Sequence, residues 1–314
     1  MDSREYFSEV ARRVKKNPIR GAAYAGYKIY DGMYYRTVSR YPRGVNVLDK
    51  EWDLLIILDA CRYEALAEVC SEYDWIDSVD KIRSIGTVTT EWMSQTFDKD
   101  HLDEVRKLAY ICSNPQAKVV FEHRDLPNGG PLPLPDADWD VVQSTDFYIF
   151  DRAWENFDPD IQSIPPRPVT DRAIRIGRHK NPERMVVHYS QPHTPFIDPE
   201  STVHDYGNYE ENLDLDASDV RQSYMDNLRY VLEDVQLLIQ SVDAQDVRIT
   251  ADHGDLLGEL DIYGHPGGCL HPKITMVPWA SATASDTGEY APDKHRESTD
   301  ASTKEILEDL GYIL

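Results

Sequence analysis

The chain has 314 residues, and the 41% that are hydrophobic are spread along its length. This composition is typical of a globular protein with a sizeable core and excludes a disordered chain. There are 56 acidic residues against 33 basic ones, a formal net charge of -23. No overall basic face can form, which excludes nucleic acid as a partner.

The distribution of charged and apolar residues also predicts a compartment. No apolar run is long enough to span a bilayer, and Met1 leads directly into charged residues, so we expect a cytoplasmic protein. Only 12 of the basic residues are Lys. An acidic, Lys-poor surface suits a cytoplasm at very high salt, where charge repulsion is screened over a few ångströms. We therefore expect a halophilic source, with an ordinary acidic protein as the alternative.

The first 50 residues form a basic segment, which we expect to be an N-terminal helical arm. They contain 11 Lys or Arg and 5 Asp or Glu, whereas the remainder contains 22 and 51. Residues 3–16 predict a helix that ends at Asn17-Pro18, and a second helix is predicted by helical spacing of Ile19, Ala23, Tyr27, Tyr30 and Tyr34. The arm could pack on the acidic body, form a dimer contact, or rest through residues 1–45 on an anionic lipid surface at the inner side of a membrane.

Residues 51–314 predict a single α/β domain. The aliphatic run DLLIILD at 53–59 has no alternation, as is typical of a strand buried on both faces of a parallel sheet. Further strands are predicted near 79–85, 108–112, 184–189 and 246–251. Helices are predicted at 63–70, 89–97, 169–177, 217–241 and 303–310, and polar loops at 123–138 and 192–216. Strands that alternate with helices indicate a mainly parallel central sheet.

Reactive side chains follow four of the predicted strands. In an open α/β sheet, ligands bind beyond the carboxyl ends of the strands. The candidates are, in chain order, Asp59, Thr87, His193, Asp252 and His253, with His265 in a loop further on. We therefore expect these side chains to lie near one another.

The types of these side chains predict a metal site. Asp59 and Asp252 offer oxygen and His253 offers nitrogen, which suits Zn²⁺ or Mn²⁺ better than Ca²⁺, with Mg²⁺ as a further option. Thr87 precedes a predicted helix, where it could bind an oxyanion and act as a metal-activated nucleophile. The histidines at 193 and 265 could bind substrate oxygens, protonate a leaving group or hold a second metal. The structural alternative for Asp59 and Thr87 is helix capping.

Several segments of the sequence, in the order in which they occur, resemble those of a known superfamily. The segment T-A-D-H-G-D-L-L-G-E at 250–259 resembles the S/T-x-D-H-G-x-x-x-G-E motif of sulfatases, lipoteichoic acid synthases and phosphoethanolamine transferases. The strand ending in L-D-A, the P-H-T-P and Y-G-H-P segments and the helix around 224–234 are similar and occur in the same order. The resemblance covers residues 53 to about 280 and looks strongest to sulfatase-like proteins of halophilic archaea. It implies an alkaline phosphatase-like three-layer α/β/α sandwich.

The resemblance also implies an activity and a set of roles. It implies a metal-dependent hydrolase or transferase acting on a phosphomonoester or phosphodiester, which could be glycan- or lipid-linked. The implied ligands of one metal are Asp59, Thr87, Asp252 and His253, with His193 and His265 near the substrate or a second metal. The segment T-V-T-T-E-W at 87–92 is similar to the nucleophile segment T-S-D-A-E-F of lipoteichoic acid synthases. Thr87 is therefore the expected nucleophile, and Thr89 or Thr90 takes that place if the match is shifted.

Two alternative functions stay open. A sulfatase of this superfamily needs Cys or Ser within C/S-x-P/A-x-R to form formylglycine. That context is absent around all four cysteines, which are Cys61, Cys70, Cys112 and Cys269, so phosphoryl transfer through a Thr is favoured over sulfate-ester hydrolysis. The second alternative is a non-catalytic protein of this fold that binds an anionic glycan or lipid headgroup. The number of metal-binding side chains argues against it.

Overall fold

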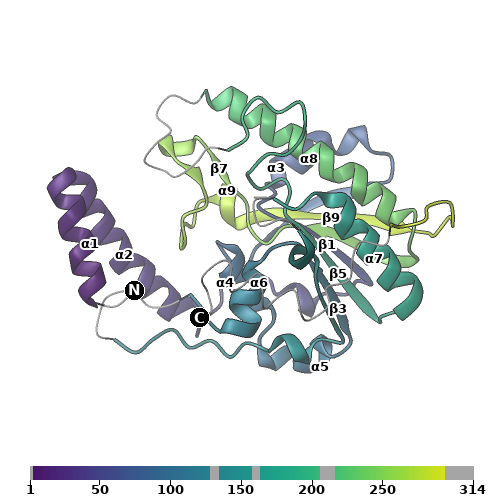
Figure 1. Ribbon diagram of the computed structural model, residues 1–314, viewed down its shortest axis with the longest axis horizontal. Helices are drawn as coiled ribbons and strands as arrows, with labels where there is room; N and C mark the ends of the chain where they lie inside the picture. Colours follow the sequence, from purple (N-terminus) through teal and green to yellow (C-terminus); the bar gives the residue numbers. More distant parts are fainter. Residues whose placement is uncertain (1–2, 128–133, 158–162, 206–215, 294–314) are drawn as a thin grey trace.

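The computed structural model describes residues 3–127, 134–157, 163–205 and 216–293, and its centre is a seven-stranded sheet (Figure 1). In spatial order the strands are β2-β9-β6-β1-β5-β3-β4. Their bounds are β1 Leu54–Leu58, β2 Ser78–Arg83, β3 Leu108–Cys112, β4 Ile149–Arg152, β5 Arg184–Tyr189, β6 Ala244–Thr250 and β9 Met276–Ala284. The pairs from β6 to β4 are parallel, and β9 is antiparallel to both of its neighbours. The sheet is therefore mainly parallel, as expected.

Helices cover both faces of this sheet. The α-helices of the described residues, including the N-terminal pair α1 and α2 that lies apart from the sheet, are α1 Ser3–Lys16, α2 Pro18–Val38, α3 Tyr63–Val69, α4 Thr89–Thr96, α5 Leu102–Val105, α6 Gln116–Lys118, α7 Pro166–Lys180, α8 Ala217–Ile239 and α9 Pro272–Thr275. A separate small hairpin pairs β7 Leu256–Leu257 with β8 Tyr263–Gly264.

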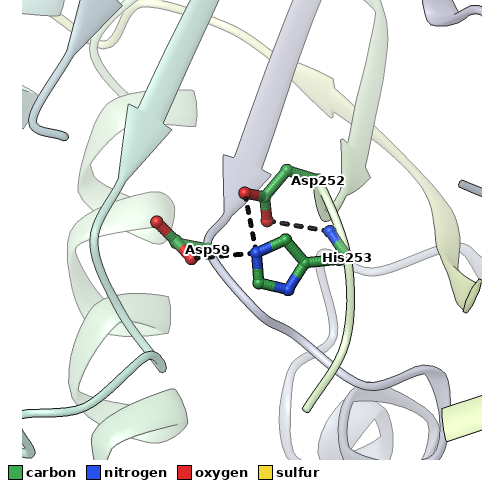
Figure 2. Close-up of side chains that lie close together, drawn as sticks. All are labelled: Asp59, Asp252 and His253. Carbon is green, nitrogen blue, oxygen red and sulfur yellow. Dashed lines mark hydrogen bonds and ion pairs between the residues drawn. The ribbon is translucent and has the colours of Figure 1, made fainter. Parts of the chain in front are cut away.

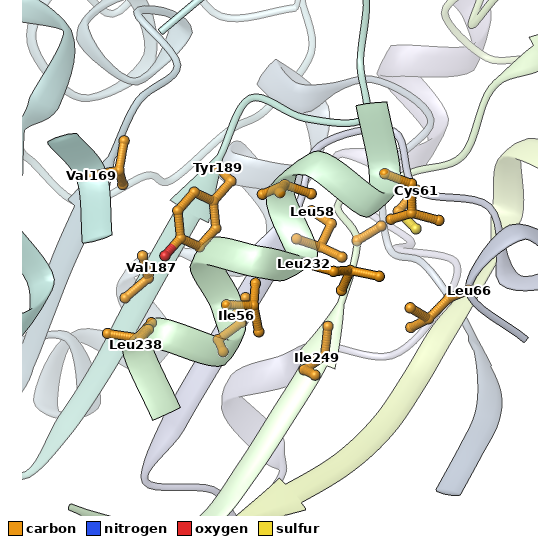
Figure 3. Packing of buried hydrophobic residues seen from close by; sticks show 14 of the residues in the cluster. Ile56, Leu58, Cys61, Leu66, Val169, Val187, Tyr189, Leu232, Leu238 and Ile249 are labelled. Atoms are coloured by element: carbon orange, nitrogen blue, oxygen red, sulfur yellow. The ribbon is translucent and has the colours of Figure 1, made fainter. Parts of the chain in front are cut away.

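The central strand β1 shows why the sheet needs cover on both sides. Ile56 and Leu58 belong to one hydrophobic core with residues of α3, α7 and α8, and Figure 3 shows them beside Leu232 of α8. Leu55 and Ile57 point the other way, into a second core with residues of α4, α5 and α6. Successive side chains of a strand alternate between faces, so a fully aliphatic strand fits only between two helical layers. The predicted three-layer α/β/α sandwich is confirmed.

The structure contains two strands of the sheet that the sequence analysis did not predict. The short edge strand β4 and the antiparallel β9 both lack a long aliphatic run. The predicted helix at 303–310 lies outside the described residues. The other predicted helices and strands are present, with ends shifted by a few residues.

The N-terminal segment forms a hairpin of two helices. Asn17 separates them, and its side chain accepts hydrogen bonds from the backbone NH groups of Ile19 and Arg20 at the start of α2. This is the geometry of a helix N-cap, followed here by proline at the first helical position. The other end of α2 packs on the body, where Tyr34, Tyr35 and Val38 form a small cluster with Ala137 and Trp139.

Candidate metal centre

Two adjacent parallel strands place the two expected aspartates side by side. In the register of β1 and β6, Ile57 is opposite Thr250, and each aspartate follows two residues later, as Asp59 and Asp252. Both carboxylates are buried, as is the neighbouring His253. The carboxyl edge of the sheet therefore brings two carboxyl groups together at a largely buried position.

Asp59, Asp252 and His253 form a compact cluster (Figure 2). One potential ligand atom from each lies within 4.8 Å of the others. His253 Nε2 lies 3.3 Å from Asp252 Oδ2 and 4.0 Å from Asp59 Oδ1. His253 Nδ1 bonds to the carbonyl oxygen of Gly254 at 2.9 Å, so it carries the hydrogen. This leaves the lone pair of Nε2 directed at the carboxylates, which is the tautomer that a metal requires.

The electrostatics of the cluster fit a divalent cation. Burial and the Asp252 carboxylate raise the pKa of Asp59 well above its ordinary value, while burial lowers the pKa of His253 to about 4. Asp59 Oδ1 is buried and has no hydrogen-bond partner among the residues that the structure describes. A buried polar atom without a partner is costly. A cation between the two carboxylates would satisfy this oxygen and balance the charge, and a neutral imidazole is available to bind it.

Two residues beyond the expected set contact or approach Asp59. Asn114 Nδ2 donates to Asp59 Oδ2 at 2.7 Å. His188 Nε2 lies 3.9 Å from the same oxygen, and the Nδ1 atom of His188 lies 2.9 Å from the hydroxyl of Tyr110. The sequence contained a signal for Asn114, because Ser113-Asn114 directly follows the predicted strand at 108–112 on the same edge of the sheet. That strand end was not among the expected site positions.

The structure does not bring Thr87 to the cluster. Its hydroxyl donates to Glu91 Oε2 at 2.7 Å and accepts from the backbone NH of Gly268 at 2.9 Å. The backbone NH of Thr87 also donates to Glu91. Glu91 is in the first turn of α4, so these bonds fix the entry of the chain into this helix. In this structure the hydroxyl of Thr87, which was expected among the metal ligands, is thus hydrogen-bonded to Glu91 and Gly268.

Thr89 lies where Thr87 was expected. It is the first residue of α4, and its hydroxyl donates to Asp252 Oδ2 at 2.7 Å. The hydroxyl oxygen of Thr89 is also 3.3 Å from His253 Nε2. Sequence similarity alone left the choice among Thr87, Thr89 and Thr90 open, because a shift of two residues within T-V-T-T changes which hydroxyl meets the strand ends.

A polar cavity of about 300 Å³ opens beside the cluster. It is lined by Asp59, Val88, Thr89, Thr90, Asn114, Pro115, Gln116, Ser163, Ser190, His193, Thr194 and His265. Both expected loop histidines therefore line the cavity, and their rings are 5.0 Å apart. The ring of His265 is also 4.1 Å from that of His253.

The pKa values of the two cavity histidines are shifted in opposite directions. Burial opposes protonation of His265, but the bond from its Nδ1 to Asp255 Oδ1, at 3.2 Å, outweighs burial and raises the pKa of this histidine. Burial and the nearby His265 lower the pKa of His193. The cavity therefore has one histidine suited to donate a proton and one suited to accept a hydrogen bond.

Comparison with known proteins supports the architecture. No protein-family model matches the chain, and no curated protein does. Among solved structures, the integral membrane protein lipooligosaccharide phosphoethanolamine transferase A of Neisseria meningitidis has a TM-score of 0.50 at 14% identity, covering 76% of this chain and 49% of that chain. The chain thus spans about half the length of that protein.

Two further solved structures are similar to the chain. The C-terminal periplasmic domain of EcEptC from Escherichia coli, in complex with Zn, has a TM-score of 0.47 at 11% identity, covering 78% of this chain and 76% of that one. A protein in the alkaline phosphatase superfamily from Vibrio parahaemolyticus has a TM-score of 0.40 at 12% identity, with coverages of 84% and 70%. Sulfatases also occur among the matches. Together with the sheet order and layers, the likeness to the phosphoethanolamine transferase structure shows that the chain shares the fold of that protein.

Proposed function

We propose that the chain is a metal-dependent enzyme that hydrolyses or transfers a phosphate ester, with Thr89 Oγ1 as the nucleophile. The position of Thr89 is the observation that carries this proposal. Its hydroxyl contacts the Asp252 carboxylate and lies beside His253, and the residue also lines the cavity. A hydroxyl placed between a cation site and a substrate-sized cavity has the setting of an activated nucleophile.

Asp59, Asp252 and His253 would hold the metal, and their oxygen and nitrogen donors suit Zn²⁺ or Mn²⁺. When bound, a divalent ion would polarise the ester and lower the pKa of a nearby hydroxyl. The chain itself supports the same charge distribution. Val88 caps α4 without a side-chain hydrogen bond, so the first backbone NH groups of this helix are not taken up by a side-chain cap. NH groups in this position favour a developing negative charge.

His265 is the proposed proton donor. The Thr89 hydroxyl gives its proton to Asp252 Oδ2, which accepts its hydrogen bond, as Thr89 Oγ1 forms a bond to phosphorus. The bond to the leaving alcohol breaks, and the proton of His265 passes to the leaving oxygen. The hydrogen bond to Asp255 raises the pKa of His265, which favours its protonated form before this step. Water or a second alcohol then takes the phosphoryl group from Thr89 and gives its proton to His265, while Thr89 Oγ1 recovers its own proton from Asp252. The enzyme is a hydrolase if the acceptor is water and a transferase if it is an alcohol.

The lining of the cavity favours one class of ester. Within the described part of the chain, that lining contains no cysteine, lysine or arginine. The lining thus offers no cysteine for a formylglycine route to sulfate esters. It does include Ser163, which begins the segment S-I-P-P-R at 163–167 and fits the serine form of the motif, so the aryl sulfate in the test below decides whether this route operates. Because the cavity has no fixed cation besides the histidines, a phosphodiester with one negative charge fits better than a phosphomonoester with two.

The proposal is tested with an isosteric pair of variants, Thr89→Val and Thr87→Val. Each is offered an aryl phosphodiester, an aryl phosphomonoester and an aryl sulfate, with Zn²⁺ or Mn²⁺, at low salt and in molar KCl because of the acidic composition. We expect Thr89→Val to lower kcat/KM for the diester about 10³-fold or more, and Thr87→Val to lower it less than about 10-fold. Thr89→Ser should retain part of the activity and become phosphorylated on the introduced serine, as detected by mass spectrometry.

Other results would decide against this assignment. Full activity in Thr89→Val with loss in Thr87→Val would return the nucleophile to Thr87. A wild type that binds either metal but turns over no ester would replace the enzyme with a non-catalytic binding protein. Turnover of the sulfate ester alone would change the substrate class.

A further inference from the structure

The α1–α2 hairpin projects from the body of the molecule, with its closed end pointing away from the sheet (Figure 1). The two helices form one unit. The hydroxyl of Tyr6 donates to the carbonyl of Ala25 at 3.2 Å, and the guanidinium of Arg13 lies 4.3 Å from the ring centre of Tyr24. A Cβ atom at Gly21 would lie 2.4 Å from the backbone nitrogen of Val14, so glycine permits the close approach of the helices near the turn.

The opposite end of the hairpin is fixed to the body by tyrosines of α2. Tyr27 and Tyr30 donate to the carbonyl oxygens of Gly267 and Gly268, at 3.0 and 2.6 Å. These glycines belong to the loop that follows His265. The hairpin is therefore anchored at one end, which gives its closed end a defined direction.

The closed end carries apolar and basic side chains together. Val14 and Ile19 are exposed, Ile19 to 83%. Lys15, Lys16 and Arg20 are also exposed, and among the described residues they have no hydrogen bond or ion pair. We refer to these five residues as the hairpin tip. The tip thus combines unpartnered cations with apolar side chains in water.

We propose that the hairpin tip docks on an anionic lipid surface. Lys and Arg near such a surface attract it, and apolar side chains between them enter the boundary between headgroups and acyl chains. The charge of the whole chain supports this orientation, because residues 1–50 carry an excess of six positive charges while the rest carries an excess of 29 negative ones. An anionic surface would attract the tip and repel the body.

The geometry favours a lipid surface over a second copy of the chain. A stable protein interface buries roughly 1,200 Å² or more in total, which the narrow end of a two-helix hairpin does not offer. A lipid surface needs only a few inserted side chains and nearby cations. No helix in the described ranges is both long and apolar enough to cross a membrane, so the proposed contact is peripheral and does not depend on the catalytic proposal.

The test is flotation of the full chain with phosphatidylcholine vesicles, with and without phosphatidylglycerol. We expect binding only to the anionic vesicles. The triple variant Lys15→Gln, Lys16→Gln, Arg20→Gln should weaken this binding about 100-fold, since each cation near the surface contributes about 5-fold. Ile19→Ser should weaken it less. The matched controls remove the same number of exposed charges from other positions (Lys50→Gln, Lys107→Gln, Lys180→Gln) or one exposed leucine (Leu260→Ser).

Circular dichroism first establishes that each protein is folded under the flotation conditions. The proposal is overturned if the folded wild type stays with the soluble fraction in the presence of anionic vesicles, or if the control triple variant loses as much binding as the tip variant. A tip variant that changes the sedimentation coefficient of the free protein would instead assign the tip to contact between copies of the chain.

Discussion

The hydroxyl of Tyr34 on α2 donates to Glu91 Oε1 on α4 at 2.9 Å, and so joins the N-terminal hairpin to the helix that carries Thr89. The other oxygen of Glu91 accepts from the backbone NH and the hydroxyl of Thr87. Glu91 is fully buried. A buried carboxylate held by three donors fixes the entry of α4, and with it the position of the proposed nucleophile.

Tyr34→Phe should destabilise the protein by about 1–2 kcal/mol. The substitution keeps the ring in its cluster and removes only the hydroxyl, so Glu91 Oε1 loses its hydrogen bond inside the protein. The free energy of unfolding from denaturant titration is the measurement, and Tyr41→Phe, at a ring that is 72% exposed, is the control. Equal stability of the two variants would show that Glu91 does not depend on Tyr34.

Glu91→Gln should change how stability depends on pH. Burial raises the pKa of Glu91 to about 7, from an ordinary value of 4.5, despite the three hydrogen bonds. Below pH 4.5 the Glu91 carboxyl is protonated in both the folded and the unfolded state, so it does not contribute to the pH dependence of stability. As pH rises towards 7 the unfolded chain loses this proton first, so the unfolded state is favoured progressively.

The measurable quantity is the stability of the wild type minus that of Glu91→Gln. We expect this difference to fall by up to about 3 kcal/mol between pH 4.5 and 7 and to level off above. Denaturant titrations at several pH values give it directly, with both proteins measured in the same buffers. A difference that rises with pH would mean that the three donors lower the pKa of Glu91 below its ordinary value.

Asn114→Ser should weaken metal binding about 10-fold or more. Asn114 fixes one oxygen of Asp59, and partners that orient a ligand in this way typically contribute 10- to 100-fold to metal affinity. In the wild type Asn114 Oδ1 accepts a hydrogen bond from the backbone NH of Gln116, and a serine hydroxyl can accept the same bond. The serine side chain is too short to reach Asp59. Calorimetric titration with Zn²⁺ or Mn²⁺ measures the change. Unchanged affinity would show that Asp59 needs no support from Asn114.

The difference between the expected and observed sites follows from what strand patterns contain. An aliphatic strand that ends in Asp59, and another that ends in Asp252-His253, specify a shared sheet edge, because parallel strands align their carboxyl ends. The choice between Thr87 and Thr89 depended instead on a local sequence similarity, because the start of the helix was predicted at residue 89 and is found there. In the structure Glu91 binds Thr87 and thereby separates its role from that of Thr89. This is a contact between side chains, which the periodicity of the sequence does not predict.

The same limit applies to the parts of the sheet that were not predicted. Strand β9 runs antiparallel through M-V-P-W-A-S-A-T-A, and only some of its residues are buried. Without a continuous aliphatic run it resembles a loop until β2 and β6 pair with it. Tyr27 and Tyr30 illustrate a related case, because their helical spacing was evident while their partners, two glycine carbonyls about 240 residues away, were not.

Asp59→Asn should be more stable than the wild type without metal and less stable than the wild type with metal. Without metal, Asp59 and Asp252 are two buried carboxylates at one strand edge, and burial with the nearby Asp252 opposes ionisation of Asp59. Asparagine removes that charge and keeps an oxygen for the hydrogen bond from Asn114. In a chelator we therefore expect Asp59→Asn to have a higher Tm than the wild type, because a like-charge contact is relieved.

With Zn²⁺ or Mn²⁺ the order should invert. The wild type gains stability by binding, in proportion to the logarithm of metal concentration over Kd, whereas the variant has lost an anionic ligand and gains less. Thermal unfolding with chelator and across a metal series measures both effects, and Asp100→Asn at an exposed position is the control. If Asp59→Asn is less stable than the wild type in chelator and both proteins gain equally from metal, Asp59 is a structural residue and the cation site must be sought elsewhere.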